Sequence, residues 1–141
     1  MNGLGLVRAD AQHTVTATSK GRLVASAGWS LWDMTFDGSP RRTAGLGRVL
    51  VHPDYRDRGI AQTVISVAVE HARAACAETM VLHCHPDQVP FFAQLGWSNV
   101  SVPVAFPQPD GAGNVPMTTM IYDLAGLPDP AAGVDLCGPP F

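Results

Sequence analysis

The stretch Arg56-Asp57-Arg58-Gly59-Ile60-Ala61 decides the fold of this chain. It follows an apolar run, Val49–Val51, and a turn-forming segment, His52-Pro53-Asp54, and a helical pattern begins at about Ile60. A glycine turn at a helix start leaves backbone N–H groups unpaired, and the helix dipole adds partial positive charge there. Such a turn binds phosphate groups, and two neighbouring arginines can add charge-assisted hydrogen bonds.

Neither of the two common phosphate-binding loops is present, because the chain has no G-x-x-x-x-G-K-[ST] and no G-x-G-x-x-G after a strand. The pattern is R-x-x-G-x-A. It resembles the acyl-CoA pyrophosphate loop of the GNAT superfamily of N-acyltransferases, which reads Q/R-x-x-G-x-G/A. Taken alone, it also fits an ordinary strand, glycine turn and helix.

A second motif supports the resemblance. The segment Pro90-Phe91-Phe92-Ala93-Gln94-Leu95-Gly96-Trp97 is similar to the later signature of the family, an aromatic pair followed by x-x-x-G-F/W. The two motifs stand in the right order, with one helix and one strand between them. The chain is therefore identified as a member of this superfamily over residues 47 to 97, and more loosely to its end.

Composition indicates a single folded domain. The chain has 141 residues, and 46% hydrophobic against 15% charged residues is enough apolar material for one core. The net charge of −3, without a basic stripe, argues against nucleic acid. No apolar run reaches the roughly 20 residues that cross a bilayer, which argues against a membrane. Three cysteines without paired spacing fit a reducing, cytoplasmic setting.

The pattern predicts an α/β fold with a mixed (α+β) sheet: antiparallel hairpins plus one parallel strand pair around a central helix. We expect one GNAT-like domain over 1–125 and a proline-rich tail over 126–141. The tail is either disordered or extended over the domain. The predicted strands are 14–19, 23–32, 43–52, 80–84, 100–106 and 117–124, and the predicted helices are 60–77 and 89–95. A turn is predicted at 37–40 and a loop at 107–116, and Gly96 suits a left-handed cap after the second helix. The buried face of the first helix is predicted from residues at helical spacing, which are Ile60, Val64, Val67, Ala68, His71 and Ala75.

The start of the chain departs from the family. The resemblance implies a strand and two helices before the first hairpin, but here the hairpin begins at about Thr14. Those helices form one wall of the acceptor site. Three alternatives follow: a partner subunit supplies the wall, the site is open, or the start codon was placed late.

The resemblance implies acetyl-CoA as co-substrate. Backbone N–H groups of the loop would hold its pyrophosphate, and the strand Val49–Val51 would pair with the pantetheine arm and offer an N–H, at Leu50 or Val51, to the thioester oxygen. Phe92 stands where many members carry a tyrosine that protonates the thiolate. The residues predicted to bind acetyl-CoA are Val49, Leu50, Val51, Arg56, Asp57, Arg58, Gly59, Ile60, Ala61 and Phe92.

A proton acceptor is less evident. The third strand reads Gly45-Leu46-Gly47-Arg48, without the glutamate that many members place there. His83 and His85, on alternate positions of the fourth strand, are candidate bases, or half-buried polar residues satisfied by backbone or water. Cys84 between them is a small apolar residue or a nucleophile. Two histidines without further ligands do not predict a metal site.

The last residues, 133–141, are similar to the ending of relatives of aminoglycoside 2′-acetyltransferases, in which the final residue reaches the acceptor pocket. The resemblance implies that the ring and terminal carboxylate of Phe141 line that pocket and take the proton; the alternative is a loose terminus. Trp29 and Trp32 either face the pocket, as substrate-binding residues, or pack in the core. Asp33 and Asp37 are further charges that could attract an amine.

Two functions follow from these residues. The first is an N-acetyltransferase acting by direct attack of an amine, on a small molecule or peptide, at acetyl-CoA. The alternative is a non-catalytic module that binds acyl-CoA or a protein partner. The sequence leaves the acceptor open and allows a homodimer.

Overall fold

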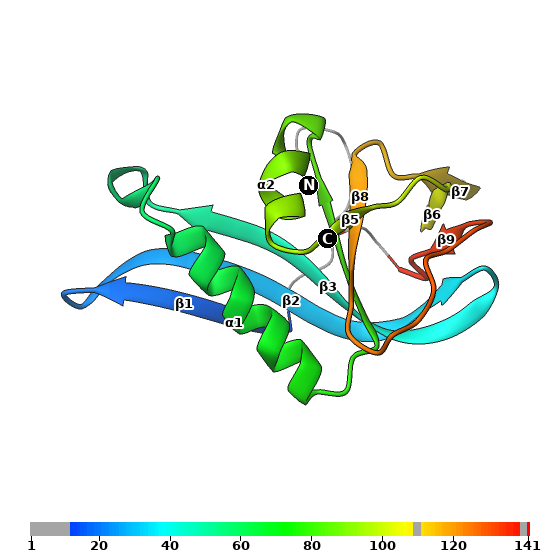
Figure 1. The fold of residues 1–141 in the computed structure, drawn as a ribbon, viewed down its shortest axis with the longest axis horizontal. Helices are drawn as coiled ribbons and strands as arrows, with labels where there is room; N and C mark the ends of the chain where they lie inside the picture. Colours follow the sequence, from blue (N-terminus) through cyan, green and yellow to red (C-terminus); the bar gives the residue numbers. More distant parts are fainter. Residues whose placement is uncertain (1–11, 109–110, 139–140) are drawn as a thin grey trace.

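The computed structural model describes residues 12–108, 111–138 and 141. Within these ranges the strands form one curled mixed sheet in the order β5-β8-β4-β3-β2-β9-β6-β7, with β1 also paired to β2 (Figure 1). The two α-helices are α1 (Ile60–Ala74) and α2 (Val89–Gln94). The predicted fold class is confirmed: hairpins surround a central helix, and β3 and β4 run parallel.

The first three strands form two antiparallel hairpins. They are β1 (His13–Ser19), β2 (Arg22–Phe36) and β3 (Ser39–Val51). Compared with the predicted 23–32 and 43–52, β2 continues four residues further and β3 begins four residues earlier. The predicted four-residue turn at 37–40 is wrong, because Asp37 and Gly38 alone make the turn, with φ of 53° and 81°. A two-residue turn with both φ positive matches the twist of long strands, so pairing continues to its edge.

Helix α1 ends three residues earlier than the predicted Ala77. Cys76 has a left-handed φ of 65°. Its N–H donates to the Arg73 carbonyl, and the N–H of Ala77 donates to the Ala72 carbonyl, both at 3.0 Å. These two hydrogen bonds form a Schellman cap. Such a cap usually has glycine at the left-handed position, and because Cys76 stands there instead, the sequence carries no signal for the end of the helix.

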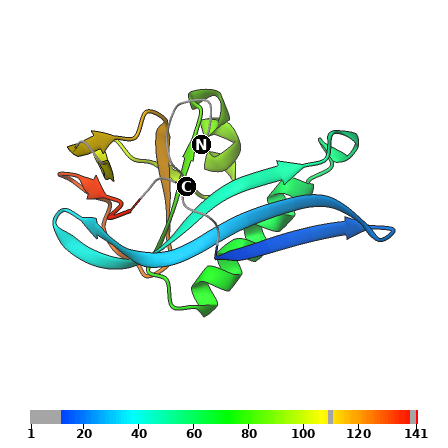
Figure 2. The same ribbon diagram turned by 180° about the vertical axis from the view of Figure 1, so that it is seen from behind.

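Helix α1 covers one face of β1, β2 and β3 (Figure 1). Its buried residues are Val64, Ile65, Ala68, Val69 and Ala72. Val67 and His71, predicted on the buried face, are exposed instead. The buried stripe follows i, i+1, i+4 and i+5, because the helix packs on a broad sheet and not on a narrow ridge. Seen from behind (Figure 2), the opposite face of these strands carries no helix from the described ranges.

The crossover through α1 leads to β4 (Thr79–Cys84), which pairs in parallel with β3 from Thr43↔Thr79 to Leu46↔Leu82. Two 3₁₀ turns, Pro53–Tyr55 and Pro86–Gln88, precede α1 and α2. Gly96 follows α2 with φ of 99°, as the predicted left-handed cap requires.

The second half of the sheet differs most from the prediction. The strands are β5 (Ser98–Asn99), β6 (Val104–Gln108), β7 (Gly111–Asn114) and β8 (Thr118–Asp123). The predicted single strand 100–106 is correct only from Val104. The Val100 N–H still donates to the Thr119 carbonyl of β8 at 2.9 Å, and the chain then leaves that edge before pairing resumes at Val104. The predicted loop 107–116 contains β7, which pairs with β6 as a hairpin.

The tail lies against the far end of the β2–β3 hairpin. Its strand β9 (Val134–Asp135) pairs antiparallel with Thr35 and Phe36 of β2 and parallel with β6. Figure 1 shows β9 beside β6, and β7 follows on the other side of β6. Phe141 is buried with Met34, Phe36 and Leu136 in a second apolar cluster, on the sheet face opposite α1.

The docking of the tail should depend on pH. The Asp37 carboxylate accepts hydrogen bonds from the N–H groups of Ala131, Ala132 and Gly133, and these, with the charge of Arg41, hold the pKa of Asp37 below its ordinary value. Because the folded pKa is the lower one, this stabilisation is complete above the ordinary value of about 3.9 and is lost as the pH falls through the folded value.

We therefore expect the Trp32 indole N–H, which donates to the Leu136 carbonyl at 2.7 Å, to become solvent-exposed as the pH falls through the lowered pKa of Asp37. The measurement is its NMR resonance across an acid titration. Asp33→Asn, at an exposed position on the same strand, is the control and should leave the titration unchanged. A Trp32 resonance that stays fixed while other Asp37-linked amides change would contradict the expectation.

Candidate active site

A cleft of about 750 Å³ opens between the end of β3, the start of α1 and α2. Its lining includes every residue predicted to bind the cofactor except Arg58. Sequence reasoning missed four further lining residues, which are Tyr55, Gln62, Gln88 and Phe91. The polar members could have been found from their position, since they fall in the turns and helix starts that flank the two motifs.

The glycine turn leads directly into α1. Gly59 is the N-cap residue with a left-handed φ of 75°, and no side chain caps the helix. The first N–H groups of a helix have no partner within it, and Ile60 and Ala61, which carry two of them, line the cleft. A Cβ built at Gly59 would meet only Gln62 Oε1, at 3.5 Å, so no side chain blocks the turn.

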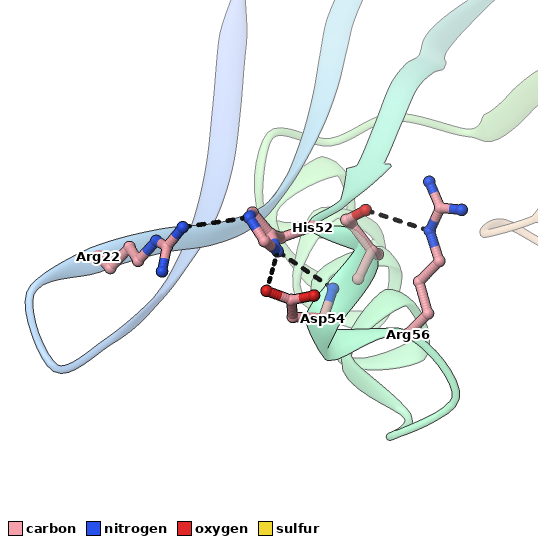
Figure 3. Close-up of polar contacts among 5 residues, drawn as sticks. Arg22, His52, Asp54 and Arg56 are labelled. Atoms are coloured by element: carbon pink, nitrogen blue, oxygen red, sulfur yellow. Dashed lines mark hydrogen bonds and ion pairs between the residues drawn. The ribbon is translucent and has the colours of Figure 1, made fainter.

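The segment that leads into the glycine turn is held by His52 (Figure 3). His52 Nδ1 accepts a hydrogen bond from the Asp54 N–H at 3.1 Å, which caps the 3₁₀ turn Pro53–Tyr55. In the neutral ring the proton then lies on Nε2, so the 3.3 Å approach of Arg22 to Nε2 is a contact and not a second accepted hydrogen bond. The cap fixes the direction in which the chain enters residues 56–59.

The two arginines of the motif lie differently. Arg56 lines the cleft, and its Nε donates to the Val51 carbonyl at 3.4 Å, as Figure 3 shows. Arg58 does not line the cleft, and its guanidinium lies over the Tyr55 ring, 5.2 Å from the centroid. Only Arg56 of this pair is therefore placed to reach a ligand inside the cleft without rearrangement.

Strand β3 stays paired with β2 up to Val51 but parts from β4 just before the cleft. Gly28 pairs with Gly47, but Ser26 pairs with Leu50, so one residue of β2 opposes two of β3, and Arg48 has a left-handed φ of 53°. This is a β-bulge, which kinks the strand. The parallel pairing with β4 stops at Leu46, and beyond it β3 and β4 diverge.

The backbone of Val51 is directed toward the cleft. The His52 N–H donates to the Val24 carbonyl on β2, so by the alternation of an antiparallel strand the N–H and C=O of Val51 point away from β2. The Arg56 contact with the Val51 carbonyl agrees with this direction. Of the two predicted oxyanion donors, Val51 is therefore better placed than Leu50, whose N–H points toward β2 by the same alternation.

On the opposite face of β3, Phe141 covers two glycines. A Cβ at Gly45 would lie 2.9 Å from three atoms of the Phe141 ring, and a Cβ at Gly47 would lie 3.0 Å from its terminal carboxyl carbon. Real Cβ atoms essentially never show the contact at Gly45, and a Cβ at Gly47 would require the terminal carboxyl group to shift by a few tenths of an ångström. The terminal carboxylate thus occupies the space in which a side chain from β3 would begin. Glycine within an apolar strand signals such an approach, and that signal was available in the sequence.

His83 and His85 do not form a pair. His83 is half-buried on β4; its Nδ1 lies 3.0 Å from Thr119 Oγ1, and its ring centroid lies 4.6 Å from that of Phe141. Thr119 also lines a groove of about 400 Å³ beside β8. His85 follows the strand, is exposed, and donates its backbone N–H to Gln88 Oε1. His83 therefore lies beside the terminal residue, and His85 caps a turn.

The two tryptophans lie on different sides of β2. Trp29 is 5% exposed, packs in the core under α1 and stacks on His13 with centroids 4.3 Å apart. It also lines a cavity the size of one water molecule beside Phe141. Trp32 contacts Phe141 edge to face at 5.4 Å. Asp37, considered as an amine-attracting charge, is instead bonded to the tail.

Phe92 and Cys84, the remaining candidate residues, are both buried. Phe92 is 8% exposed, lines the cleft and contacts Phe91 and Trp97. Burial, and then the charge of Asp87, raise the pKa of the Cys84 thiol, which disfavours the reactive thiolate. Over the described ranges, no three His, Cys, Asp or Glu side chains gather as a metal site needs. No helix there is long and apolar enough to cross a membrane.

Comparison with known proteins identifies the family. The family model described as the acetyltransferase (GNAT) family matches residues 4–97, more than half of the chain. The chain belongs to the GNAT acetyltransferase family. The match spans both motifs, so the resemblance inferred from them is confirmed. A search of curated proteins found no match.

Solved GNAT structures share this fold. The E. coli N-acetyltransferase YhbS, solved with CoA, is 15% identical with a TM-score of 0.66, covering 89% of this chain and 67% of its own. A Brucella melitensis acetyltransferase with acetyl-CoA is 20% identical (TM-score 0.56, covering 86% and 63%). A Kribbella flavida GCN5-related N-acetyltransferase is 24% identical (TM-score 0.55, covering 62% and 22%). The chain thus spans less than a quarter of the Kribbella protein.

Proposed function

We propose that this chain is an N-acetyltransferase that moves an acetyl group from acetyl-CoA to an amine by direct attack. The carrying observation is the cleft, which joins an uncapped helix N-terminus at Gly59 to the diverging end of β3. The family match and the CoA and acetyl-CoA complexes of its structural neighbours support acetyl-CoA as the ligand.

The cleft offers each part of acetyl-CoA a matching surface. The pyrophosphate meets the unpaired N–H groups at the start of α1 and the Arg56 guanidinium. The pantetheine amides pair with the exposed backbone of β3 as an added strand, which the divergence from β4 makes possible. The thioester oxygen then lies near the Val51 N–H, where it can be stabilised as negative charge develops.

The acceptor approaches from the side of Phe141. A neutral amine attacks the thioester carbon, the C–S bond breaks and CoA leaves as thiolate. The proton released from the amine nitrogen passes to the Phe141 carboxylate, directly or through water, with His83 as the neighbouring group. The thiolate leaves without a side-chain acid, since Phe92 has none to offer, and takes a proton from water. A thiol of pKa near 8.5 is a tolerable leaving group.

The acceptor is an amine that the negative charge of the Phe141 carboxylate attracts. Thr119, whose hydroxyl lies 3.0 Å from His83 Nδ1, also lines the groove of about 400 Å³ beside β8. This groove has room for the part of a small molecule or peptide that carries the amine. We also propose a cytoplasmic setting, since Cys76, Cys84 and Cys137 are all free thiols. A homodimer would place a second subunit on the face of β1–β3 that Figure 2 shows without a described helix.

An assay with acetyl-CoA and a panel of amines tests the proposal. Acetylated product should be detected by mass spectrometry, because a thiol reagent would also label the exposed Cys76 and Cys137. Turnover of at least one amine supports the enzyme. Tight binding of acetyl-CoA without turnover of any amine would favour the alternative, a binding module.

Arg56→Ala should weaken acetyl-CoA binding by about 1–3 kcal/mol, because one charge-assisted contact with the pyrophosphate is lost. Arg58→Ala is the matched control: it removes the same charge, yet Arg58 lies outside the cleft, so we expect a smaller loss. Calorimetric titration of both variants gives the comparison. Equal affinity of Arg56→Ala and the unchanged protein would remove Arg56 from the site.

A further inference from the structure

The tail is fastened to the sheet at separate points along its length. Near its start, Arg41 Nη2 donates to the Pro128 carbonyl at 2.8 Å. In its middle, Ala131, Ala132 and Gly133 donate to the Asp37 carboxylate at 2.6 to 3.1 Å, and the Asp37 N–H donates to the Gly133 carbonyl at 2.8 Å. These contacts all involve the far end of the β2–β3 hairpin, away from the cleft.

Trp32 makes the contact closest to the terminal residue. Its indole N–H donates to the Leu136 carbonyl at 2.7 Å, and its ring meets the Phe141 ring edge to face with centroids 5.4 Å apart. The Leu136 N–H donates to the Ala105 carbonyl of β6. One side chain therefore holds both the main chain of the tail and the ring at its end.

The position of Phe141 leaves little tolerance for movement. Its ring and carboxyl carbon already occupy the space above Gly45 and Gly47, so a tail that shifts along β3 would carry the carboxylate away from the divergence of β3 and β4. A displacement of about 1 Å in a reacting geometry can cost about 10²-fold in rate.

We propose that Trp32 and Asp37 are positioning residues that hold the terminal carboxylate of Phe141 at the acceptor side of the site. This rests on the proposed function. In this proposal Trp32 holds the tail in place and does not bind the substrate. Asp37 acts by binding the N–H groups of the tail and not by attracting the amine.

The first experiment compares Trp32→Phe with the unchanged protein, in two backgrounds. Trp32→Phe keeps an aromatic ring and loses the N–H. We expect kcat to fall about 10-fold, with KM for acetyl-CoA unchanged because Trp32 does not line the cleft. In a chain lacking Phe141 the same substitution should have no further effect. An equal additional loss in that background would overturn the proposal, since Trp32 would then act independently of the carboxylate.

The second experiment separates position from charge. Asp37→Ala removes the acceptor of three tail N–H groups, whereas Asp33→Ala removes an exposed carboxylate on the same strand. We expect only Asp37→Ala to lower kcat. Equal losses in both variants would show that the charge matters and would overturn the positioning role.

Hydrogen exchange gives a readout that does not require turnover. The amides of Val134 and Leu136, bonded to Pro103 and Ala105, should exchange faster in Trp32→Phe and Asp37→Ala and not in Asp33→Ala. If no amine is a substrate but exchange responds in this way, the proposed function fails and the fastening of the tail stands. If exchange responds while kcat does not, the positioning role is rejected and the transferase stands.

Discussion

Deleting Phe141 should lower kcat by about 10²–10⁴-fold, the range that a lost proton acceptor costs, with little change in acetyl-CoA binding. The deletion removes a ring buried on Gly45 and a carboxylate seated over Gly47, and neither lines the cofactor cleft. Steady-state rates with an active amine, together with a calorimetric titration of acetyl-CoA, measure the two effects separately.

Two further variants separate the ring from the carboxylate. Phe141→Leu keeps the terminal carboxylate and should retain most of the activity, whereas one glycine appended after Phe141 keeps the ring, moves the carboxylate and should lose activity as the deletion does. An appended glycine without effect on kcat would show that the carboxylate takes no part in the reaction.

The same placement can be tested from β3. Gly47→Ala puts a Cβ 3.0 Å from the terminal carboxyl carbon, so the tail end must shift and kcat should fall. Gly138→Ala is the matched control, because its Cβ would make an ordinary contact with Trp32 Nε1 at 3.7 Å. A normal rate in Gly47→Ala would contradict the seating of the carboxylate on this strand.

Gly59→Trp should raise the dissociation constant of acetyl-CoA by about 100-fold or more, since several charge-assisted hydrogen bonds to the pyrophosphate are lost together. The indole would fill a turn that is now open. Because Gly59 has φ of 75°, the substitution also strains the backbone, so Gly59→Asn, which tolerates this conformation and is small, controls for folding. Thermal unfolding of both variants shows whether the domain remains intact.

The cleft to which we assign acetyl-CoA could be predicted because its lining residues are close together in the sequence. Gly59 follows a turn and begins a helix, so its unpaired N–H groups follow from a few adjacent residues. The strand Val49–Val51 was predicted for the same reason. The early end of α1 at a left-handed Cys76 was not, because helix ends of this kind are usually marked by glycine or asparagine and not by cysteine.

The acceptor side of the proposed active site depends on contacts between residues that are far apart in the sequence. Phe141 meets Gly45 and Gly47 only because β9 pairs with both β2 and β6, and neither the β6–β7 hairpin nor that pairing leaves an alternating apolar pattern in the sequence. Trp29 and Trp32 had the same two possible roles in the sequence analysis. Because they are three residues apart on one strand, the period of two places their side chains on opposite faces of β2.

The central claim is that the peptide nitrogens around Gly59 bind the diphosphate of coenzyme A. Calorimetric titration of the unchanged protein and of Gly59→Trp, each with acetyl-CoA and with S-acetylpantetheine, tests it most directly. S-acetylpantetheine lacks both the diphosphate and the adenosine 3′-phosphate, so the comparison between the two proteins isolates the part that depends on the Gly59 turn. We predict that the unchanged protein binds acetyl-CoA about 100-fold or more tightly than S-acetylpantetheine, and that Gly59→Trp removes most of this difference. The same preference in both proteins, or none in the unchanged protein, would contradict the claim.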